Sequence, residues 1–374
     1  MPGKVLMLLS KDFYFDSRVL SEYQALCDEG FDVRVIMWDR EGRYHDKVDD
    51  GVYPIAIENN GHSLLNQYLS WWRKAMDYAG NLYKHKRWRF DVVHCHDFDT
   101  LPVGVMVKKL FDCTLVYDAH DVYEHLPGLS SLMRKGIGFG DRRLLPYADQ
   151  VITAHQPTVA YYQSRTNVPV CGLVNCVNPL VDSYVPPVDD GVFRLCYFGL
   201  MTKSRWFPRI VDVVGDMPGV ELVLGSRNEG LYKEVKEACK KYQNTRFLGQ
   251  LSVDELLSQM LRCDATFALA DLDVVPHNHN VYGKQFQAMA CGRPIICTKG
   301  TWSGDFTIQN EVGITVEDTF LGIKKGVEML RDDPYLCQSL GKNALRLCQN
   351  RFNWDLEKQQ LLGVYKNINN EFLR

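Results

Sequence analysis

The sequence predicts an α/β protein built from two doubly wound domains, each with a parallel β-sheet. Short apolar runs alternate with amphipathic helical segments, which is the pattern of repeated βα units. A second series of such units begins at residue 193, and 374 residues are enough to form two cores. An apolar content of 46% and a charged content of 24% are typical of globular proteins.

The first series of units begins near the N-terminus. Residues 4–10 form an apolar run typical of a buried parallel strand, and apolar positions then recur at helical spacing from Arg18 to Gly30. Residues 31–37 form the next strand, and repetition of this right-handed unit gives a doubly wound sheet. No G-x-G-x-x-G follows the first strand, so the dinucleotide fingerprint is absent there.

Two later strands, at residues 91–97 and 114–120, end in histidines and carboxylates. Open α/β sheets bind ligands outside the carboxyl ends of their strands, so these side chains are expected at one rim. They are His94, His96, Asp97, Asp118, His120 and Asp121. A metal site made from them is conceivable, but no pair has the helical spacing of H-E-x-x-H, and we predict no metal. His94 and Asp97 are better interpreted as caps of the following helices.

Residues 62–89 interleave aromatic rings with cations. This composition suits a membrane interface or a phosphorylated acceptor. The alternative is a long crossover helix that packs its rings on the sheet, which the core-like spacing of Leu65, Leu69 and Trp72 favours slightly.

The composition also predicts domain boundaries. We expect a first domain at residues 1–180, a proline-rich linker at 181–192 and a second domain at 193–345. Residues 346–374 read as helices that are candidates to return to the first domain.

Residues 280–297 describe a short helix between two strands. Gly292 and Pro294 supply the usual stop signal. Gly283 and Lys284 lie at the helix N-terminus, where free backbone N–H groups and the dipole favour an anion. Gln287 is three residues beyond Lys284 and shares its face. A cation and an amide at this position indicate a nucleotide site.

This segment resembles the donor-site helix of family-four glycosyltransferases, whose pattern is close to P-x-K-x-x-E-x-M-A-x-G-x-P-V-I. Lys284 matches the Lys, Gln287 stands at the Glu, and Tyr282 stands at the Pro. The M-A-x-G-x-P-V-I part of the pattern is matched by Met289, Ala290, Gly292, Pro294, Ile295 and Ile296. Segments similar to the family's D-V-V-H-x-H, Y-D-x-H and A-D-x-V-I-T follow in order in the first half. The resemblance therefore covers nearly the whole chain.

The resemblance implies a GT-B fold, with two Rossmann-like domains that face one another across a cleft. It also implies transfer of a sugar, with retention, from a nucleoside-diphosphate sugar to a glycan or lipid-linked acceptor in surface polysaccharide or glycoconjugate synthesis. Neither a cofactor nor a metal is expected. The catalytic positions implied are His120, Arg205 and Lys284. Donor-binding positions are Gly199, Gly249, Leu251, Gly283, Gln287 and His279, and acceptor-side positions are Asp16, His96, Asp97 and Asp118.

Besides Tyr282, two positions that would contact the donor depart from the family pattern. Leu200 stands where the family has Arg, and Gln287 replaces a Glu that contacts ribose. The changes leave two other functions open, a non-catalytic partner or regulator and a sugar-nucleotide epimerase on the same fold. The tripeptide from Asp271 to Asp273 spells D-x-D, but we interpret it as a turn.

Charge and cysteine usage limit the possible location and partners of the protein. The net charge of −3 argues against a general nucleic-acid binder. Twelve cysteines without a C-x-x-C pair are typical of reduced thiols in a cytosolic protein. The apolar run at residues 5–9 is too short for a signal-peptide core, and none approaches the length that spans a bilayer. We therefore expect a cytoplasmic protein, with peripheral attachment to an anionic inner membrane face as the alternative.

Overall fold

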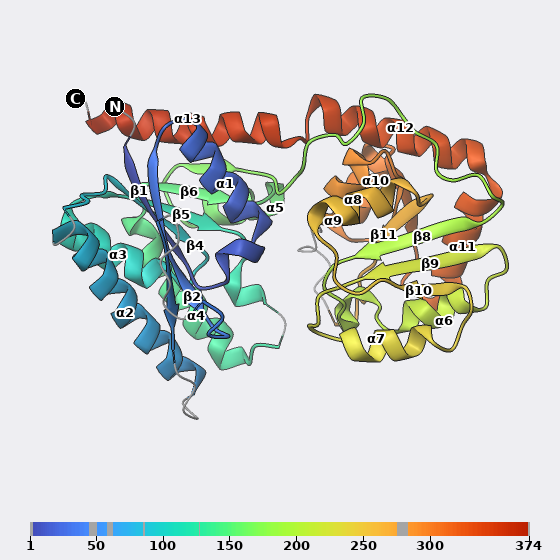
Figure 1. Cartoon of the computed structure of the whole chain (residues 1–374), viewed down its shortest axis with the longest axis horizontal. Helices are drawn as coiled ribbons and strands as arrows, with labels where there is room; N and C mark the ends of the chain where they lie inside the picture. The colour runs from blue at the N-terminus through green and yellow to red at the C-terminus, as the bar shows by residue number, and fades with distance from the viewer. Residues whose placement is uncertain are drawn as a thin grey trace. The chain divides into compact units, whose positions relative to one another are not determined.

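The computed structural model describes residues 3–44, 51–57, 63–84, 87–126, 128–274 and 283–372. The chain forms two compact units (Figure 1). The first comprises Met1–Val174 with Glu357–Arg374, and the second comprises Asn175–Leu356. Each contains one parallel sheet with helices around it, which confirms the predicted fold class.

The first unit is built on a seven-stranded parallel sheet with the order β3-β2-β1-β4-β5-β6-β7. The strands are β1 (Lys4–Leu9), β2 (Asp32–Asp39), β3 (Val52–Ala56), β4 (Val92–His96), β5 (Thr114–Ala119), β6 (Gln150–Thr153) and β7 (Val170–Gly172). Their apolar residues are almost continuously buried because helices cover both faces of the sheet. The strand order reverses between β1 and β4, and such a switch point is where open sheets bind ligands.

The helices of this unit are α1 (Ser17–Asp28), α2 (Leu64–Lys84), α3 (Leu101–Phe111), α4 (Ser131–Leu144) and α5 (Gln156–Gln163), with short 3₁₀ turns η1 (Phe13–Phe15), η2 (Tyr123–His125) and η3 (Leu145–Tyr147). The last helix, α13 (Trp354–Phe372), belongs to this unit from Glu357 onward. It is held by Tyr365, which is fully buried and lies with its hydroxyl 2.9 Å from His94 Nδ1.

Helix α2 contains most of the aromatic and basic stretch. Trp71 is fully buried and stacks on Trp38 with ring centroids 6.0 Å apart. Trp72 Nε1 donates to the Asp99 carbonyl at 2.7 Å, and the Tyr68 hydroxyl donates to the Asp99 carboxylate at 3.1 Å. These rings therefore pack in the unit's core, as expected of a crossover helix. The expectation that Leu65 and Leu69 share this core position is wrong, because they are 64% and 48% exposed. Within the described ranges, no helix is long and apolar enough to cross a membrane.

The second unit has a six-stranded parallel sheet with the order β10-β9-β8-β11-β12-β13. The strands are β8 (Phe193–Phe198), β9 (Val220–Gly225), β10 (Thr245–Phe247), β11 (Ala265–Ala268), β12 (Ile295–Thr298) and β13 (Gly313–Val316). The helices are η4 (Lys203–Arg205), α6 (Arg209–Gly215), α7 (Tyr232–Cys239), α8 (Val253–Leu261), α9 (Gly283–Ala290), α10 (Trp302–Gln309), α11 (Phe320–Asp332) and α12 (Pro334–Asn350). The order reverses between β8 and β11, which places a second switch point there.

The boundaries between the units differ from those expected. The chain passes from the first unit to the second after Val174, whereas the sequence predicted a linker at 181–192. That segment belongs to the second unit because Arg293 Nη2 donates to the Val185 carbonyl at 2.9 Å and Asp190 pairs with Arg194. Likewise α12 stays with the second unit, so the return to the first begins at Glu357 rather than at residue 346.

Candidate active site

The N-terminus of α9 carries Lys284, whose side chain is closely packed. Lys284 Nζ donates to Gln287 Oε1 at 3.1 Å, as their spacing on one helix face predicts. Gly199 follows β8 with a φ of 150°, and a Cβ built there would lie 2.5 Å from Lys284 Cε. Glycine at position 199 therefore makes the space that the lysine occupies.

Two arginines add positive charge beside this lysine. Arg205 Nη1 donates to the Tyr197 hydroxyl and to the Leu200 carbonyl, both at 3.1 Å. Burial, together with the charges of Arg205 and Arg227, lowers the pKa of Lys284 to about 8. Like charges held together are unfavourable until an anion binds, so this cluster is suited to an anionic ligand. Arg227 was not predicted; its signal is its position just beyond the end of β9.

Two other predicted donor residues, Gly249 and Leu251, lie at the neighbouring strand ends. Gly199 N–H donates to the Gly225 carbonyl at 2.9 Å, and the Gly249 carbonyl accepts from Ser226 N–H at 2.9 Å. A Cβ at Gly225 would lie 3.3 Å from Leu251 Cδ1, so Gly249 and Leu251 surround this strand end.

Three further predicted positions have different outcomes. A Cβ at Gly283 would lie 3.8 Å from Asn175 Nδ2, so position 283 is beside the start of the second unit. His279 lies outside the described residues. Asp271 accepts a hydrogen bond from Arg209 and one from Asp273 N–H, in a turn as expected.

The first unit contains a buried acid–base cluster centred on Asp118, at the end of β5. Arg18 donates to both carboxylate oxygens of Asp118, from Nη2 at 2.8 Å and from Nε at 3.2 Å. His120 Nε2 lies 2.8 Å from Asp118 Oδ2. Burial alone would raise the pKa of Asp118, but Arg18 and His120 hold it well below its usual range. Asp118 is therefore ionised.

His120 is the member of this cluster that reaches the surface, with a side chain 12% exposed. Its backbone N–H donates to Asp97 Oδ1 at 3.2 Å, and Lys11 Nζ donates to Asp97 Oδ2 at 2.6 Å. Burial lowers the pKa of His120, but the carboxylates of Asp118 and Asp97 outweigh it and raise the value to about 9. His120 is thus a protonated donor near neutral pH.

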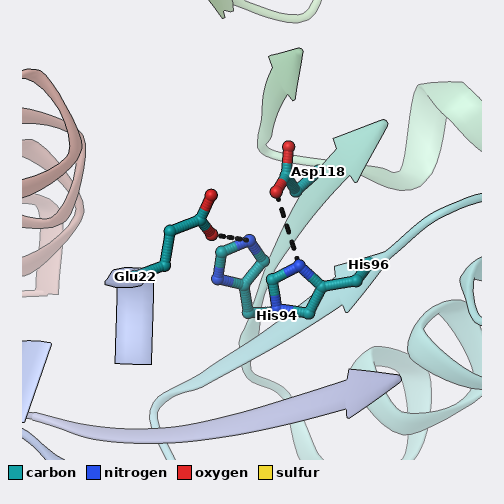
Figure 2. A group of neighbouring side chains, drawn as sticks. All are labelled: Glu22, His94, His96 and Asp118. Atoms are coloured by element: carbon teal, nitrogen blue, oxygen red, sulfur yellow. Dashed lines mark ion pairs between the residues drawn. The ribbon is translucent and has the colours of Figure 1, made fainter. Parts of the chain in front are cut away.

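Asp118 is also one of four possible metal ligands, which are drawn in Figure 2. Glu22, His94, His96 and Asp118 each offer one ligand atom, and these atoms lie within 4.8 Å of one another. His94 Nε2 is 3.9 Å from Glu22 Oε2, and His96 Nδ1 is 3.4 Å from Asp118 Oδ2. Imidazole and carboxylate ligands suit several transition metals. However, Arg18 already contacts both carboxyl groups, since its Nε is also 3.1 Å from Glu22 Oε1, and burial beside Asp118 raises the pKa of Glu22 well above its usual value.

The predicted acceptor-side residues are only partly brought together. His96, Asp97, Asp118 and His120 form one network, because His96 Nδ1 lies 3.3 Å from His120 Nε2. Asp16 instead caps α1, where its Oδ1 accepts from a backbone N–H at 3.2 Å.

The predicted helix-capping roles of His94 and Asp97 are wrong. His94 is turned inward to Tyr365, and Asp97 is bound to Lys11 and His120 with a φ of 69°. The sequence interpretation also missed Arg18, which binds Asp118 at the centre of the network. Its signal was a glutamate four residues later on the same predicted helix.

The protonation of His120 predicts how stability depends on pH. Its folded pKa of about 9 exceeds the ordinary value of 6.5, so its contribution is full below pH 6.5 and is lost as pH rises through 9. We expect this histidine to account for a fall of about 3 kcal/mol in the free energy of unfolding across that window. Urea unfolding measured at several pH values gives the dependence of the free energy of unfolding on pH. This dependence should be shallower for His120→Gln than for His125→Gln, a control at a partly exposed histidine. Equal slopes would contradict the assigned charge.

Comparisons with known proteins show what the chain is similar to. Residues 16–170 match the family model described as a glycosyl transferase 4-like domain. The chain is 22% identical to glycogen synthase of Mycobacterium tuberculosis over 347 residues, which cover 86% of this chain and 81% of the relative.

Solved structures share the architecture of the whole chain. Sucrose-phosphate synthase from Thermosynechococcus elongatus aligns with a TM-score of 0.76 and 16% identity, over 98% of this chain and 99% of that one. Anabaena HepE in complex with UDP-glucose aligns with a TM-score of 0.73 and 16% identity, over 98% and 100% of the two chains. The chain therefore has the GT-B fold of these structures, and its residues 16–170 match a glycosyl transferase 4-like domain.

Proposed function

We propose that the protein transfers a sugar from a nucleoside-diphosphate donor, bound at the N-terminus of α9, to an acceptor held beside His120. The observation that carries this proposal is the placement of Lys284 against Gly199 and Gln287, with Arg205 and Arg227 close by. A cluster of cations at a helix N-terminus is suited to a diphosphate.

The chemistry follows from where charge develops. The bond between sugar and phosphate breaks, and negative charge grows on the departing diphosphate. Lys284, Arg205 and the N-terminal N–H groups of α9 are fixed in advance near that charge, which is the arrangement that lowers such a barrier most. These groups supply positive charge that a divalent ion would otherwise supply.

His120 is proposed to act on the acceptor side. Because Asp118 and Asp97 keep its imidazole protonated, it can donate hydrogen bonds to a sugar hydroxyl or to the reacting centre. Retention of configuration, a hexose as the transferred sugar and a role in surface polysaccharide or glycoconjugate synthesis rest on the family resemblance. The same resemblance supports a glycan or a lipid-linked acceptor.

The first donor to test is a uridine diphosphate sugar, because HepE, a structural neighbour, has been solved with UDP and with UDP-glucose. We expect UDP or another nucleoside diphosphate to raise the melting temperature, as any ligand selective for the folded state does. A flat response to all common nucleoside diphosphates at millimolar concentration would remove the proposed site. An epimerised sugar nucleotide as product would instead identify an epimerase.

Gln287 permits a second test of the donor site. Its amide oxygen already accepts from Lys284, and Gln287→Glu would place a carboxylate there. We expect donor binding to tighten with little change in turnover, because ribose contacts are the same before and during transfer. Gln287→Met, which keeps the length of the side chain without a polar end, is the matched control. Loss of transfer in Gln287→Glu would show that the amide has a role that a carboxylate cannot fill.

The second candidate is a non-catalytic partner or regulator, which the departures at Leu200 and Gln287 favour. Leu200 contributes only its carbonyl to Arg205, and its side chain is 40% exposed. Nucleotide binding without transfer or hydrolysis across a panel of donors and acceptors would favour this candidate.

A further inference from the structure

Helix α4 of the first unit, labelled in Figure 1, has an outer face that carries apolar and basic side chains together. We call this set the α4 face; it comprises Leu132, Lys135, Phe139, Arg142 and Arg143. At about 100° of rotation per residue, the five positions lie within about 100° of arc. Leu132 is 81% exposed and Phe139 is 67% exposed, which is unusual for side chains of this size.

The opposite side of the helix accounts for its packing. Gly138 and Asp141 are buried, and Asp141 Oδ1 accepts from the Tyr117 hydroxyl at 3.3 Å. Arg134 donates to three backbone carbonyls in the segment that leads into the helix. The α4 face is therefore not required to hold the helix on the sheet.

The charge of the α4 face has one sign. Its three ionisable residues are cations, and the helix's acidic residue, Asp141, is turned inward. Lys135, Arg142 and Arg143 line a shallow hollow together with the Phe139 ring. Three cations around an aromatic ring match a surface that offers phosphate groups next to acyl chains.

Another exposed apolar pair in the chain lacks this combination. Helix α11 of the second unit exposes Phe320 and Leu321, with Lys325 on the next turn, but Glu328 follows them. The charge there is mixed, so α11 has no comparable attraction for an anion.

We propose that the α4 face binds the surface of an anionic phospholipid membrane. Phe139 and Leu132 enter the boundary between headgroups and acyl chains, while Lys135, Arg142 and Arg143 contact lipid phosphates. Binding at this face does not depend on transfer at the donor site. It therefore has a readout separate from that of the proposed function.

Sedimentation of the full chain with lipid vesicles tests the proposal. We expect binding to vesicles of phosphatidylcholine with one part in three phosphatidylglycerol, weaker binding to phosphatidylcholine alone, and weaker binding at high salt. Lys135→Gln with Arg143→Gln should lower the partition coefficient roughly 25-fold, or roughly fivefold per charge. Leu132→Ser with Phe139→Ser should also lower it by roughly tenfold or more.

The matched controls are Phe320→Ser with Leu321→Ser and Lys324→Gln with Lys325→Gln on α11, which should bind as the unmodified protein does. All substituted side chains on the α4 face are exposed, and circular dichroism checks that each variant is folded. If the unmodified protein stays in the supernatant at low salt, or if the α4 variants sediment as well as the controls, the proposal is overturned. Concentration-dependent dimers that Phe139→Ser abolishes, without vesicle binding, would instead identify an interface between two copies.

Discussion

Replacement of Lys284 by alanine is expected to lower the turnover of sugar transfer by roughly two or more powers of ten. The amine is held between Gly199 and Gln287, and its charge matters most when the diphosphate departs. A group used mainly in the transition state lowers kcat when it is removed, rather than only weakening the donor's binding. Steady-state kinetics with the donor identified by thermal shift provides the measurement.

Lys299→Ala is the matched control for this substitution. Lys299 lies in the same unit, with a side chain 66% exposed and paired with Glu317. Exposed ion pairs of this kind contribute little to the free energy of unfolding, so Lys299→Ala should keep both the turnover and the stability of the unmodified protein. If Lys284→Ala transfers sugar as fast as Lys299→Ala, the proposed position of the diphosphate is wrong.

Arg18→Met is expected to cause the largest loss of stability, about 3–5 kcal/mol in the free energy of unfolding. Arg18 is 5% exposed, donates twice to Asp118 and contacts Glu22. Its removal leaves the carboxylate of Asp118 buried beside a second acidic group. Methionine fills much of the volume, so the effect reports the lost charge and hydrogen bonds rather than a cavity.

Urea unfolding followed by circular dichroism measures this effect. Arg43→Met, which removes an exposed ion pair with Glu41, should change stability by less than about 1 kcal/mol. The stability of Arg18→Lys should lie between those of the two methionine variants, because lysine keeps the charge but loses the bidentate contact with Asp118. Equal stability of Arg18→Met and Arg43→Met would show that the cluster is not held by the arginine.

Much of the fold could be predicted because its signals are local. Buried parallel strands such as β1 and β12 appear as short apolar runs, and the end of α9 is marked by Gly292 and Pro294. Position at a strand end was also sufficient to place Asp118 and His120 at one rim, since parallel strands end on the same edge.

The features that were missed depend on distant parts of the chain. Arg18 and Asp118 are one hundred positions apart, and their contact exists only once β1 and β5 lie in one sheet. Asp97 was wrongly interpreted as a helix cap because its two partners, Lys11 and His120, come from other strand ends. The α4 face was hidden for a different reason: periodicity shows that one side of a helix is buried, but not that an apolar residue such as Phe139 lies on the other side.

The most direct test of the donor site is calorimetric titration of UDP into the full chain at pH 7 and pH 9, with Lys284→Ala in parallel. Because the pKa of Lys284 is about 8 in the free protein, its amine is mostly charged at pH 7 and mostly neutral at pH 9. We expect UDP to bind more weakly at the higher pH, and we expect Lys284→Ala to bind it more weakly without this pH dependence. Equal affinity of the two proteins at both pH values would contradict a diphosphate site at the N-terminus of α9.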